Sequence, residues 1–149
     1  MKAYQQLDGC LFCRIAAGEI SAHTVHDGER VLAFLDINPI RPGHVQIIPR
    51  AHYPWFEDMP PELAGEIVAL GQRIAAALKA IHGVARVGFL FTGGDIPHAH
   101  AHVVPLAAHD DITSRRYIAE ETVTYRAAPR ATDAELSAEA GAIRALISP

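Results

Sequence analysis

The segment HAHAHVVP, residues 98–105, places a histidine at every second position of an otherwise apolar run that ends at a proline. Alternate side chains of an extended strand point to the same face, so His98, His100 and His102 should line one face of a strand. The alanines between them should face a closely packed helix. Desolvating three polar rings is costly, and no packing requirement explains it. The segment therefore predicts a strand that is closed by Pro105 and carries a functional site.

The segments around this strand predict an α+β fold: a mainly antiparallel five-stranded sheet with a long central helix and a C-terminal helix. An Asp-Gly pair at 27–28 lies between two β-rich runs and is a strong hairpin signal. Apolar residues three and four positions apart predict the long helix over about 60–82. Asp58 should cap its start and Gly83 its end. The expected strands are 23–27, 30–36, 44–49, 84–91 and 98–105, with an edge segment at 122–126, and strand 84–91 should be buried. Two shorter helices should lie within 10–18 and over 133–147, and Thr132 or Asp133 should cap the second of them.

Length and composition are those of one globular domain over residues 1–149. The formal net charge is −4, and the basic residues are scattered rather than gathered in a stripe that could neutralise a run of phosphates. Nucleic acid is therefore not expected as a partner. No apolar run is long enough for a membrane span, and the N-terminus lacks the apolar core of a secretory signal. We therefore expect a cytoplasmic protein without membrane association.

The histidine segment is compatible with two kinds of chemistry. In the first, alternating histidines supply ligands to a catalytic metal, as neutral imidazoles commonly do. In the second, one histidine attacks phosphorus while its neighbours orient the ring and hold the phosphate oxygens. Cys10 and Cys13 form a Cys-x-x-Cys pair, which is open to a metal or a redox interpretation. The pair does not lie between a strand and a helix in a thioredoxin-like order, which weakens the redox interpretation.

HAHAHVV resembles the His-x-His-x-His motif, followed by two apolar residues, of the histidine triad family of nucleotide hydrolases and transferases. The resemblance extends in order over residues 10–105. CLFCRIAAGEI, residues 10–20, is similar to the N-terminal Cys-x-x-Cys segment of the family, and VLAFLDINPIRPGHVQIIPRAH, residues 31–52, is similar to its nucleotide-binding hairpin and strand. The chain after residue 105 contributes little to the resemblance.

The resemblance implies that His100 attacks the α-phosphorus of a purine nucleotide and forms a nucleotidyl-histidine intermediate. The backbone carbonyl of His98 would set the tautomer of His100, and His102 would hold a phosphate oxygen. His44, in the PGH sequence, matches a fourth histidine that supports the triad. The positions that match the family's nucleoside contacts are Asp36 for the ribose and Phe34, Ile37 and Asn38 for the base. Without the resemblance, Asp36 and Asn38 are better explained as turn residues before a proline, and only their place in the longer match favours a nucleoside contact.

In family members that carry the cysteine pair, zinc is held by the pair and by two histidines. The matching residues here are Cys10, Cys13, His52 and His98. A closed Cys₂His₂ site leaves no open position for catalysis, so this zinc would be structural. Mg²⁺ would enter only with a polyphosphate substrate. The resemblance also implies a homodimer.

The segment before the histidine motif departs from the family. Many members read Gly-Gln-Ser/Thr-Val there, with side chains that reach the phosphate and the leaving group, whereas this chain reads Gly93-Gly94-Asp95-Ile96-Pro97. The two glycines should still let backbone N–H groups approach a bound phosphate. Asp95 falls at the nucleotide site in the resemblance, but a carboxylate repels a phosphate, so on its own Asp95 is better explained as a turn residue.

These observations predict a phosphohydrolase or nucleotidyl transferase that acts on a dinucleoside polyphosphate or a nucleoside phosphoramidate. One alternative is a nucleotide-binding or interaction protein that keeps the fold but has little activity. Another is a metal-dependent enzyme that uses His100 and His102 as ligands, although no acidic or histidine partner pattern for it is visible in the motif.

Overall fold

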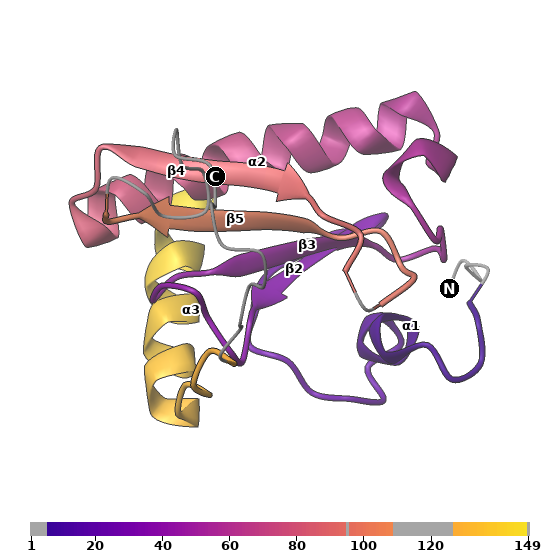
Figure 1. Ribbon diagram of the computed structural model, residues 1–149, viewed down its shortest axis with the longest axis horizontal. Coiled ribbons are helices and arrows are strands. Elements are labelled where there is room, and N and C mark those ends of the chain that lie inside the picture. The colour runs from indigo at the N-terminus through magenta and orange to yellow at the C-terminus, as the bar shows by residue number, and fades with distance from the viewer. Residues whose placement is uncertain (1–5, 95, 109–126, 149) are drawn as a thin grey trace, which may run out of the picture.

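A five-stranded sheet in which every neighbouring pair of strands is antiparallel forms the centre of the protein (Figure 1). The computed structural model describes residues 6–94, 96–108 and 127–148. The strands follow the order β1-β2-β3-β5-β4 across the sheet. Their bounds are β1 Thr24–Asp27, β2 Val31–Leu35, β3 Val45–Pro49, β4 Arg86–Phe91 and β5 Ala101–Leu106, and the helices are α1 Leu11–Ala16, α2 Pro61–His82 and α3 Asp133–Ile147, with a 3-10 turn at Phe56–Asp58. The predicted α+β architecture is confirmed.

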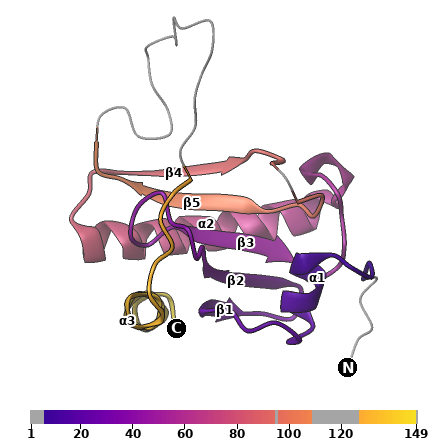
Figure 2. The same cartoon turned by 60° about the horizontal axis from the view of Figure 1, so that its bottom comes forward.

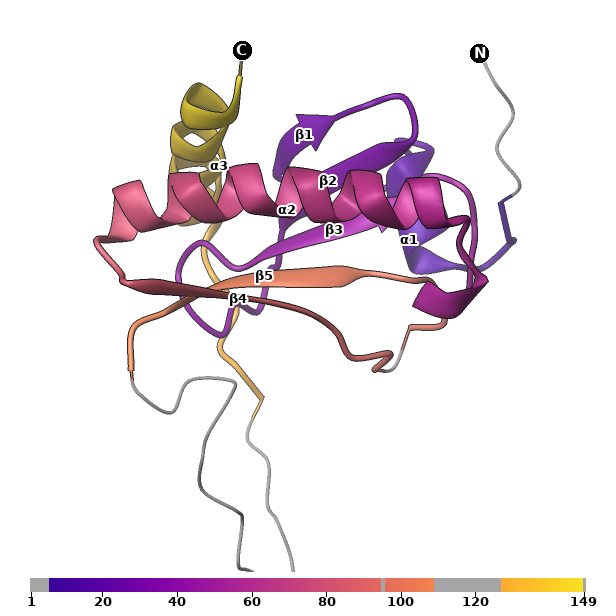
Figure 3. The same ribbon diagram turned by 90° about the horizontal axis from the view of Figure 1, so that it is seen from above.

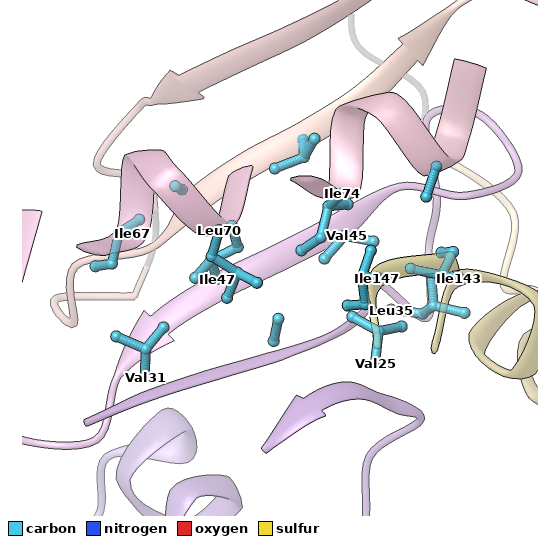
Figure 4. Packing of buried hydrophobic residues seen from close by; sticks show 14 of the residues in the cluster. Val25, Val31, Leu35, Val45, Ile47, Ile67, Leu70, Ile74, Ile143 and Ile147 are labelled. Carbon is cyan, nitrogen blue, oxygen red and sulfur yellow. The ribbon is translucent and has the colours of Figure 1, made fainter. Parts of the chain in front are cut away.

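Helices α2 and α3 cover one face of this sheet (Figures 2 and 3). The main core lies between them and the strands, where one stripe of α2 packs on alternate residues of β2, β3 and β5 (Figure 4). Ala99 and Ala101 belong to this core, so the alanines of the histidine segment do face a helix, as predicted. The α2 stripe consists of Leu63, Ile67, Leu70, Ile74 and Leu78, all buried. None of the helices in the described part of the chain is long and apolar enough to cross a membrane.

The opposite face carries a smaller core beneath α1. Phe12 and Ala16 of α1 pack there against Leu32 and Phe34 of β2 and Ile48 of β3. The short helix covers only this part of the face (Figure 2). Side chains alternate along a strand, so Gln46 of β3 and His102 of β5 lie on this same face. These two side chains form a polar strip beside the smaller core.

Three local predictions are corrected by the structure. β4 is a strand, but its residues are half-buried or exposed, because it is the edge strand of the sheet and has β5 on one side only. β5 begins at Ala101 rather than at residue 98, and it continues through Pro105, which pairs with Val87 beyond the part of β5 that β3 contacts. A proline is tolerated there because no β3 partner requires its missing N–H.

The start of α2 also differs from the prediction. Asp58 does not cap that helix, whose N-cap residue is Pro60 without a side-chain hydrogen bond. Its carboxylate instead accepts a hydrogen bond from the Trp55 backbone N–H, 3.1 Å away, within the 3-10 turn. Gly83 ends α2 in the left-handed conformation and Thr132 caps α3, both as predicted. The expected edge segment at 122–126 lies outside the described residues.

Candidate functional site

The approach of the chain to β5 orients His98 and His100 through backbone carbonyls. His98 Nε2 donates to the carbonyl oxygen of Pro49, 2.9 Å away, so its Nδ1 carries the lone pair. His100 Nδ1 donates to the carbonyl oxygen of His98 at 2.7 Å, which leaves the lone pair of His100 on Nε2. A neutral imidazole with a free Nε2 is the nucleophilic form of histidine.

His44 and His102 form a second oriented pair on the neighbouring strands. The Ile40 backbone N–H donates to His44 Nδ1 at 3.2 Å, so the ring hydrogen of His44 lies on Nε2. His44 Nε2 donates in turn to His102 Nδ1 at 2.8 Å. The hydrogen of His102 is therefore on Nε2, where Thr92 Oγ1 lies 3.5 Å away. His102 thus presents an N–H donor at the site, next to the ring of His100, whose centroid is 5.0 Å from that of His102.

Burial keeps these rings neutral. Burial, together with a smaller effect of the neighbouring His44 and His100, lowers the pKa of His102 to about 4. Burial also lowers the pKa of His44, although the carboxylate of Asp36 opposes the shift. A neutral pair is required for the hydrogen bond between them, since His102 Nδ1 must accept it. The donor at His102 Nε2 is therefore present at neutral pH without a positive charge.

Asp36 lies just beyond β2, beside the histidine pair. Its carboxylate accepts hydrogen bonds from the Asn38 backbone N–H at 2.8 Å and from Gln46 Nε2 at 2.6 Å. Its Oδ2 is 3.8 Å from His44 Nε2. These contacts hold the carboxylate at the edge of the histidine site, at the end of the sheet where β3 begins. An ionised carboxylate with spare lone pairs is a suitable acceptor for paired hydroxyl groups.

The sulfur and imidazole ligands predicted for zinc converge at the start of α1. His98 Nδ1 is 3.4 Å from Cys10 Sγ and 3.5 Å from Cys13 Sγ, and His52 Nδ1 is 3.4 Å from Cys13 Sγ. All the ligand atoms lie within 4.8 Å of one another. A tetrahedral zinc with ordinary bond lengths would hold sulfur and nitrogen about 3.6 Å apart. The donor set therefore fits a closed zinc site.

The surroundings of the cysteines favour a cation. The backbone N–H groups of Leu7 and Cys13 donate to the sulfurs of Cys13 and Cys10, respectively, each at 3.5 Å. Burial raises the pKa of the Cys13 thiol, because a thiolate loses its hydration inside the protein. A bound cation would offset this cost.

Asp36, His44 and His102 form another group of close donor atoms, but their hydrogen bonds do not suit a metal. His44 Nε2 carries a hydrogen that it donates to His102 Nδ1, so neither atom has a free lone pair. Among the described residues, no such group includes His100. The alternative in which His100 and His102 ligate a catalytic metal therefore gains no support from this geometry.

The other residues predicted to contact the nucleotide differ in how close they lie to the histidines. Phe34 is buried against Phe12, whose ring contacts His98 and His100, whereas Ile37 is 46% exposed in the β2–β3 connection. The side-chain amide of Asn38 donates to the Ala128 carbonyl at 3.0 Å, so it ties the β2–β3 connection to the segment before α3. Gly93 and Gly94 both have positive φ, at 83° and 47°, after the end of β4. Asp95 lies outside the described residues.

A cavity of about 460 Å³ adjoins His100. Its walls come from the β3–α2 connection and from the segment between β4 and β5. The lining residues are Pro54, Trp55, Phe56, Glu57, Phe91, Thr92, Gly93, Gly94, His98, Ala99 and His100. The cavity therefore adjoins His100, the histidine whose Nε2 lone pair is free.

Sequence reasoning missed four residues that shape the site: Phe12, Gln46, Trp55 and Thr92. The ring of Phe12 packs edge-on against both His98 and His100, at centroid distances of 5.8 and 5.1 Å. Gln46 could have been found from strand alternation, because it is two residues from His44 and therefore shares its face. Trp55 and Thr92 lie in connections, where no periodic signal exists.

Comparisons with known proteins agree on one family. The family model of the HIT domain matches residues 17–109. An uncharacterised HIT-like protein of Methanocaldococcus jannaschii is 34% identical over 100 residues, which cover 64% of this chain and 78% of that protein. An adenylylsulfatase of Arabidopsis thaliana is 31% identical over 106 residues, which cover 68% of this chain and 54% of that protein. The crystal structure of a zinc-bound histidine triad family protein from Mycobacterium smegmatis superposes with a TM-score of 0.71 and 28% identity, covering 94% of each chain.

Proposed function

The chain belongs to the HIT domain family, and from that premise we propose that it is a nucleotide-binding hydrolase or nucleotidyl transferase that uses His100 as its nucleophile. One observation carries this proposal: the 2.7 Å hydrogen bond from His100 Nδ1 to the carbonyl of His98, which leaves the Nε2 lone pair free. The hydrolase class is supported by the relative described as an adenylylsulfatase. The substrate is a purine nucleotide with a phosphoanhydride or phosphoramidate bond at its α-phosphorus.

The reaction proceeds in two displacements. The Nε2 lone pair of His100 forms a bond to the α-phosphorus, and the bond from phosphorus to the leaving group breaks. The electron pair of that bond goes to the leaving group, which takes up a proton from solvent. Water then attacks the same phosphorus and loses a proton to solvent, the electron pair of the phosphorus–nitrogen bond returns to His100 Nε2, and a nucleoside monophosphate is released. In a transferase, another nucleophile replaces the water.

His102 and Asp36 hold the nucleotide during these steps. The Nε2–H of His102 donates to a phosphate oxygen and stabilises the charge that develops on it. His44 is a positioning residue, because its own Nε2–H fixes which nitrogen of His102 carries the hydrogen. Asp36 accepts hydrogen bonds from the ribose hydroxyls, and Phe34 contributes to the base pocket.

We assign a structural role to zinc in this protein. Cys10, Cys13, His52 and His98 would hold it, and the zinc-bound relative supports this assignment. When bound, zinc neutralises the two thiolates and cross-links α1 to the chain before β5. With four protein ligands it would have no open position for a substrate. Its effect on the reaction would pass through His98, whose carbonyl orients His100.

The edge strand β4 supports a homodimer. Nothing in the described part of the chain pairs with its outer edge. Phe89 on β4 is 38% exposed and Val68 on the adjacent helix α2 is 44% exposed. A second copy could pair with this edge and bury both side chains, which is one way in which proteins cover an exposed edge. Sedimentation should then give a dimer, and Phe89→Glu should give a monomer. A monomeric wild type would contradict this assignment.

Turnover of two substrate classes tests the catalytic proposal. Adenosine 5′-phosphoramidate and a dinucleoside polyphosphate should give adenosine monophosphate with the wild type, and His100→Ala should abolish the reaction. His23→Ala is the matched control, because His23 contacts Asp133 on α3 rather than the site. Turnover that survives in His100→Ala would show that the mechanism is wrong. Binding of nucleotide without turnover of either class would favour the alternative of a binding protein with little activity.

A further inference from the structure

Gln46 lies on the central strand of the sheet, on the face that carries the proposed nucleotide site. It pairs with Phe34 of β2 on one side and with His102 of β5 on the other. His44 is two residues earlier in the chain, and its ring donates a hydrogen bond to His102. Gln46 is therefore adjacent to the histidine pair, although none of the catalytic steps proposed above uses it.

The side-chain amide of Gln46 is oriented by the carboxylate of Asp36. Gln46 Nε2 donates to Asp36 Oδ2 at 2.6 Å. The opposite orientation would bring two acceptor oxygens together, with no hydrogen between them. In the observed orientation, Oε1 of Gln46 is the one buried side-chain polar atom in the described part of the chain without a hydrogen-bond partner. Burying such an acceptor costs free energy that an apolar side chain would avoid, so stability does not explain this glutamine.

The carboxylate of Asp36 competes with His102 for the ring hydrogen of His44. Asp36 Oδ2 lies 3.8 Å from His44 Nε2, which donates to His102 Nδ1 at 2.8 Å. A shift of about 1 Å would bring Oδ2 within hydrogen-bond distance of His44. A carboxylate is a stronger acceptor than a neutral imidazole, because its charge assists the bond. His44 would then donate to Asp36, and His102 would lose the contact that places its own hydrogen on Nε2.

The hydrogen bond from Gln46 opposes this shift of the carboxylate. The other carboxylate oxygen, Oδ1, accepts from the Asn38 backbone N–H at 2.8 Å, and the Asp36 backbone N–H donates to the His44 carbonyl at 2.9 Å. These two contacts keep Asp36 beside His44. They do not by themselves fix Oδ2, because the last torsion of an aspartate side chain is broad. Gln46 Nε2 holds Oδ2 in its position 3.8 Å from His44 Nε2.

We propose that Gln46 is a positioning residue, which holds Asp36 Oδ2 and thereby reserves the Nε2–H of His44 for His102. Its importance for catalysis rests on the function proposed above, in which the Nε2–H of His102 binds a phosphate oxygen. The hydrogen bonds themselves join protein groups alone, so they can be measured without substrate. Gln46 thus lets a carboxylate serve the ribose while the adjacent histidine pair keeps its own hydrogen bond.

The nitrogen chemical shifts of His102, measured by NMR without substrate, test this role. Gln46→Met keeps the length of the side chain and removes the donor, so His102 should change from its Nε2–H form to a mixture of both tautomers. Gln72→Met is the matched control, because Gln72 is exposed on α2, and it should leave these shifts unchanged. A His102 that keeps its pure Nε2–H form in Gln46→Met would overturn the proposal.

A second substitution separates competition by the carboxylate from altered packing. Asp36→Ala removes the competing oxygen, so the double variant Asp36→Ala/Gln46→Met should again show His102 in its Nε2–H form. A mixture of tautomers in the double variant would mean that the carboxylate is not the competitor, and the proposal would be wrong. Gln46→Met alone should keep or raise the thermal midpoint of unfolding, because it removes the unpartnered acceptor. A lower midpoint with unchanged shifts of His102 would make Gln46 a structural residue instead.

Kinetics distinguish a failure of this proposal from a failure of the catalytic one. With adenosine 5′-phosphoramidate as substrate, Gln46→Met should lower kcat about tenfold, and Gln72→Met should leave it unchanged. If the wild type cleaves no nucleotide but the shifts of His102 change as expected, the catalytic proposal fails and the role of Gln46 stands. If the wild type is active and Gln46→Met matches it in both kcat and the shifts of His102, the role of Gln46 is wrong and the catalytic proposal stands.

Discussion

His98 joins the cysteine cluster to His100: its ring Nδ1 lies 3.4 Å from Cys10 Sγ, and its carbonyl oxygen accepts the Nδ1–H of His100 at 2.7 Å. The two contacts belong to one residue, and the ring is held from its other side by the Pro49 carbonyl. A displacement of the His98 ring would therefore move the acceptor that sets the tautomer of His100. The cysteine cluster and the proposed nucleophile His100 are therefore coupled through one residue, His98.

Loss of the metal should destabilise the protein. Protein purified without chelator should contain about one zinc per chain. Cys13→Ser should lower the thermal midpoint of unfolding by several degrees, because it removes the zinc ligand whose sulfur lies close to both His52 and His98. His52→Asn should act in the same direction. His26→Asn is the control, since His26 lies on β1 away from the cluster. Absence of stoichiometric zinc together with an unchanged midpoint in Cys13→Ser would refute the zinc assignment.

His44→Phe should allow the ring hydrogen of His102 to lie on either of its nitrogens. Without the Nε2–H of His44, the hydrogen of His102 is no longer restricted to Nε2, and kcat should fall about tenfold or more. The nitrogen chemical shifts of His102 measure the tautomer directly by NMR, independently of activity. His23→Phe should change neither quantity. A His102 that keeps its Nε2–H form in His44→Phe would show that this hydrogen bond does not position it.

Acidification should destabilise the fold through His102. Burial lowers the pKa of His102 to about 4, below its unfolded value near 6.5, so the unfolded chain binds a proton first. The stabilising contribution is fully present above about pH 6.5 and is lost as the pH falls to about 4. It amounts to about 3 kcal/mol. Urea unfolding of the wild type and of His102→Gln over this range should show a shallower pH dependence for the variant, and parallel curves would contradict the prediction.

Gly43→Ala should destabilise the fold by about 1–3 kcal/mol. Gly43 has φ of 93°, and a Cβ atom there would lie 2.7 Å from His82 Nε2 and 2.8 Å from Glu139 Oε1. The control is Gly65→Ala on α2, where a Cβ atom meets nothing within 4 Å. That variant should be more stable by about 0.5–1 kcal/mol, since alanine favours a helix. Chemical denaturation measures both, and equal stabilities would refute the argument.

The elements with a local signal could be predicted from the sequence. The apolar stripe of α2, the Asp-Gly hairpin and the Thr132 cap depend on residues within a few positions of one another, so a linear pattern contains them. The alternation of histidines and alanines also predicted which side chains share a face. It did not predict that β5 starts only at Ala101, because strand bounds depend on where β3 and β4 provide partners.

By itself, the sequence determined the residue types available for chemistry, their spacing and the side of the sheet on which they lie. Only the tertiary structure decided which nitrogen of each histidine carries its hydrogen, because the acceptors and donors are distant in the chain: the Pro49 carbonyl for His98, and His44 for His102. It also brought Cys10 to His98 across 88 positions and formed the aromatic cavity from two connections without periodicity. Hydrogen-bond partners and cavities depend on packing between elements, which no local pattern encodes.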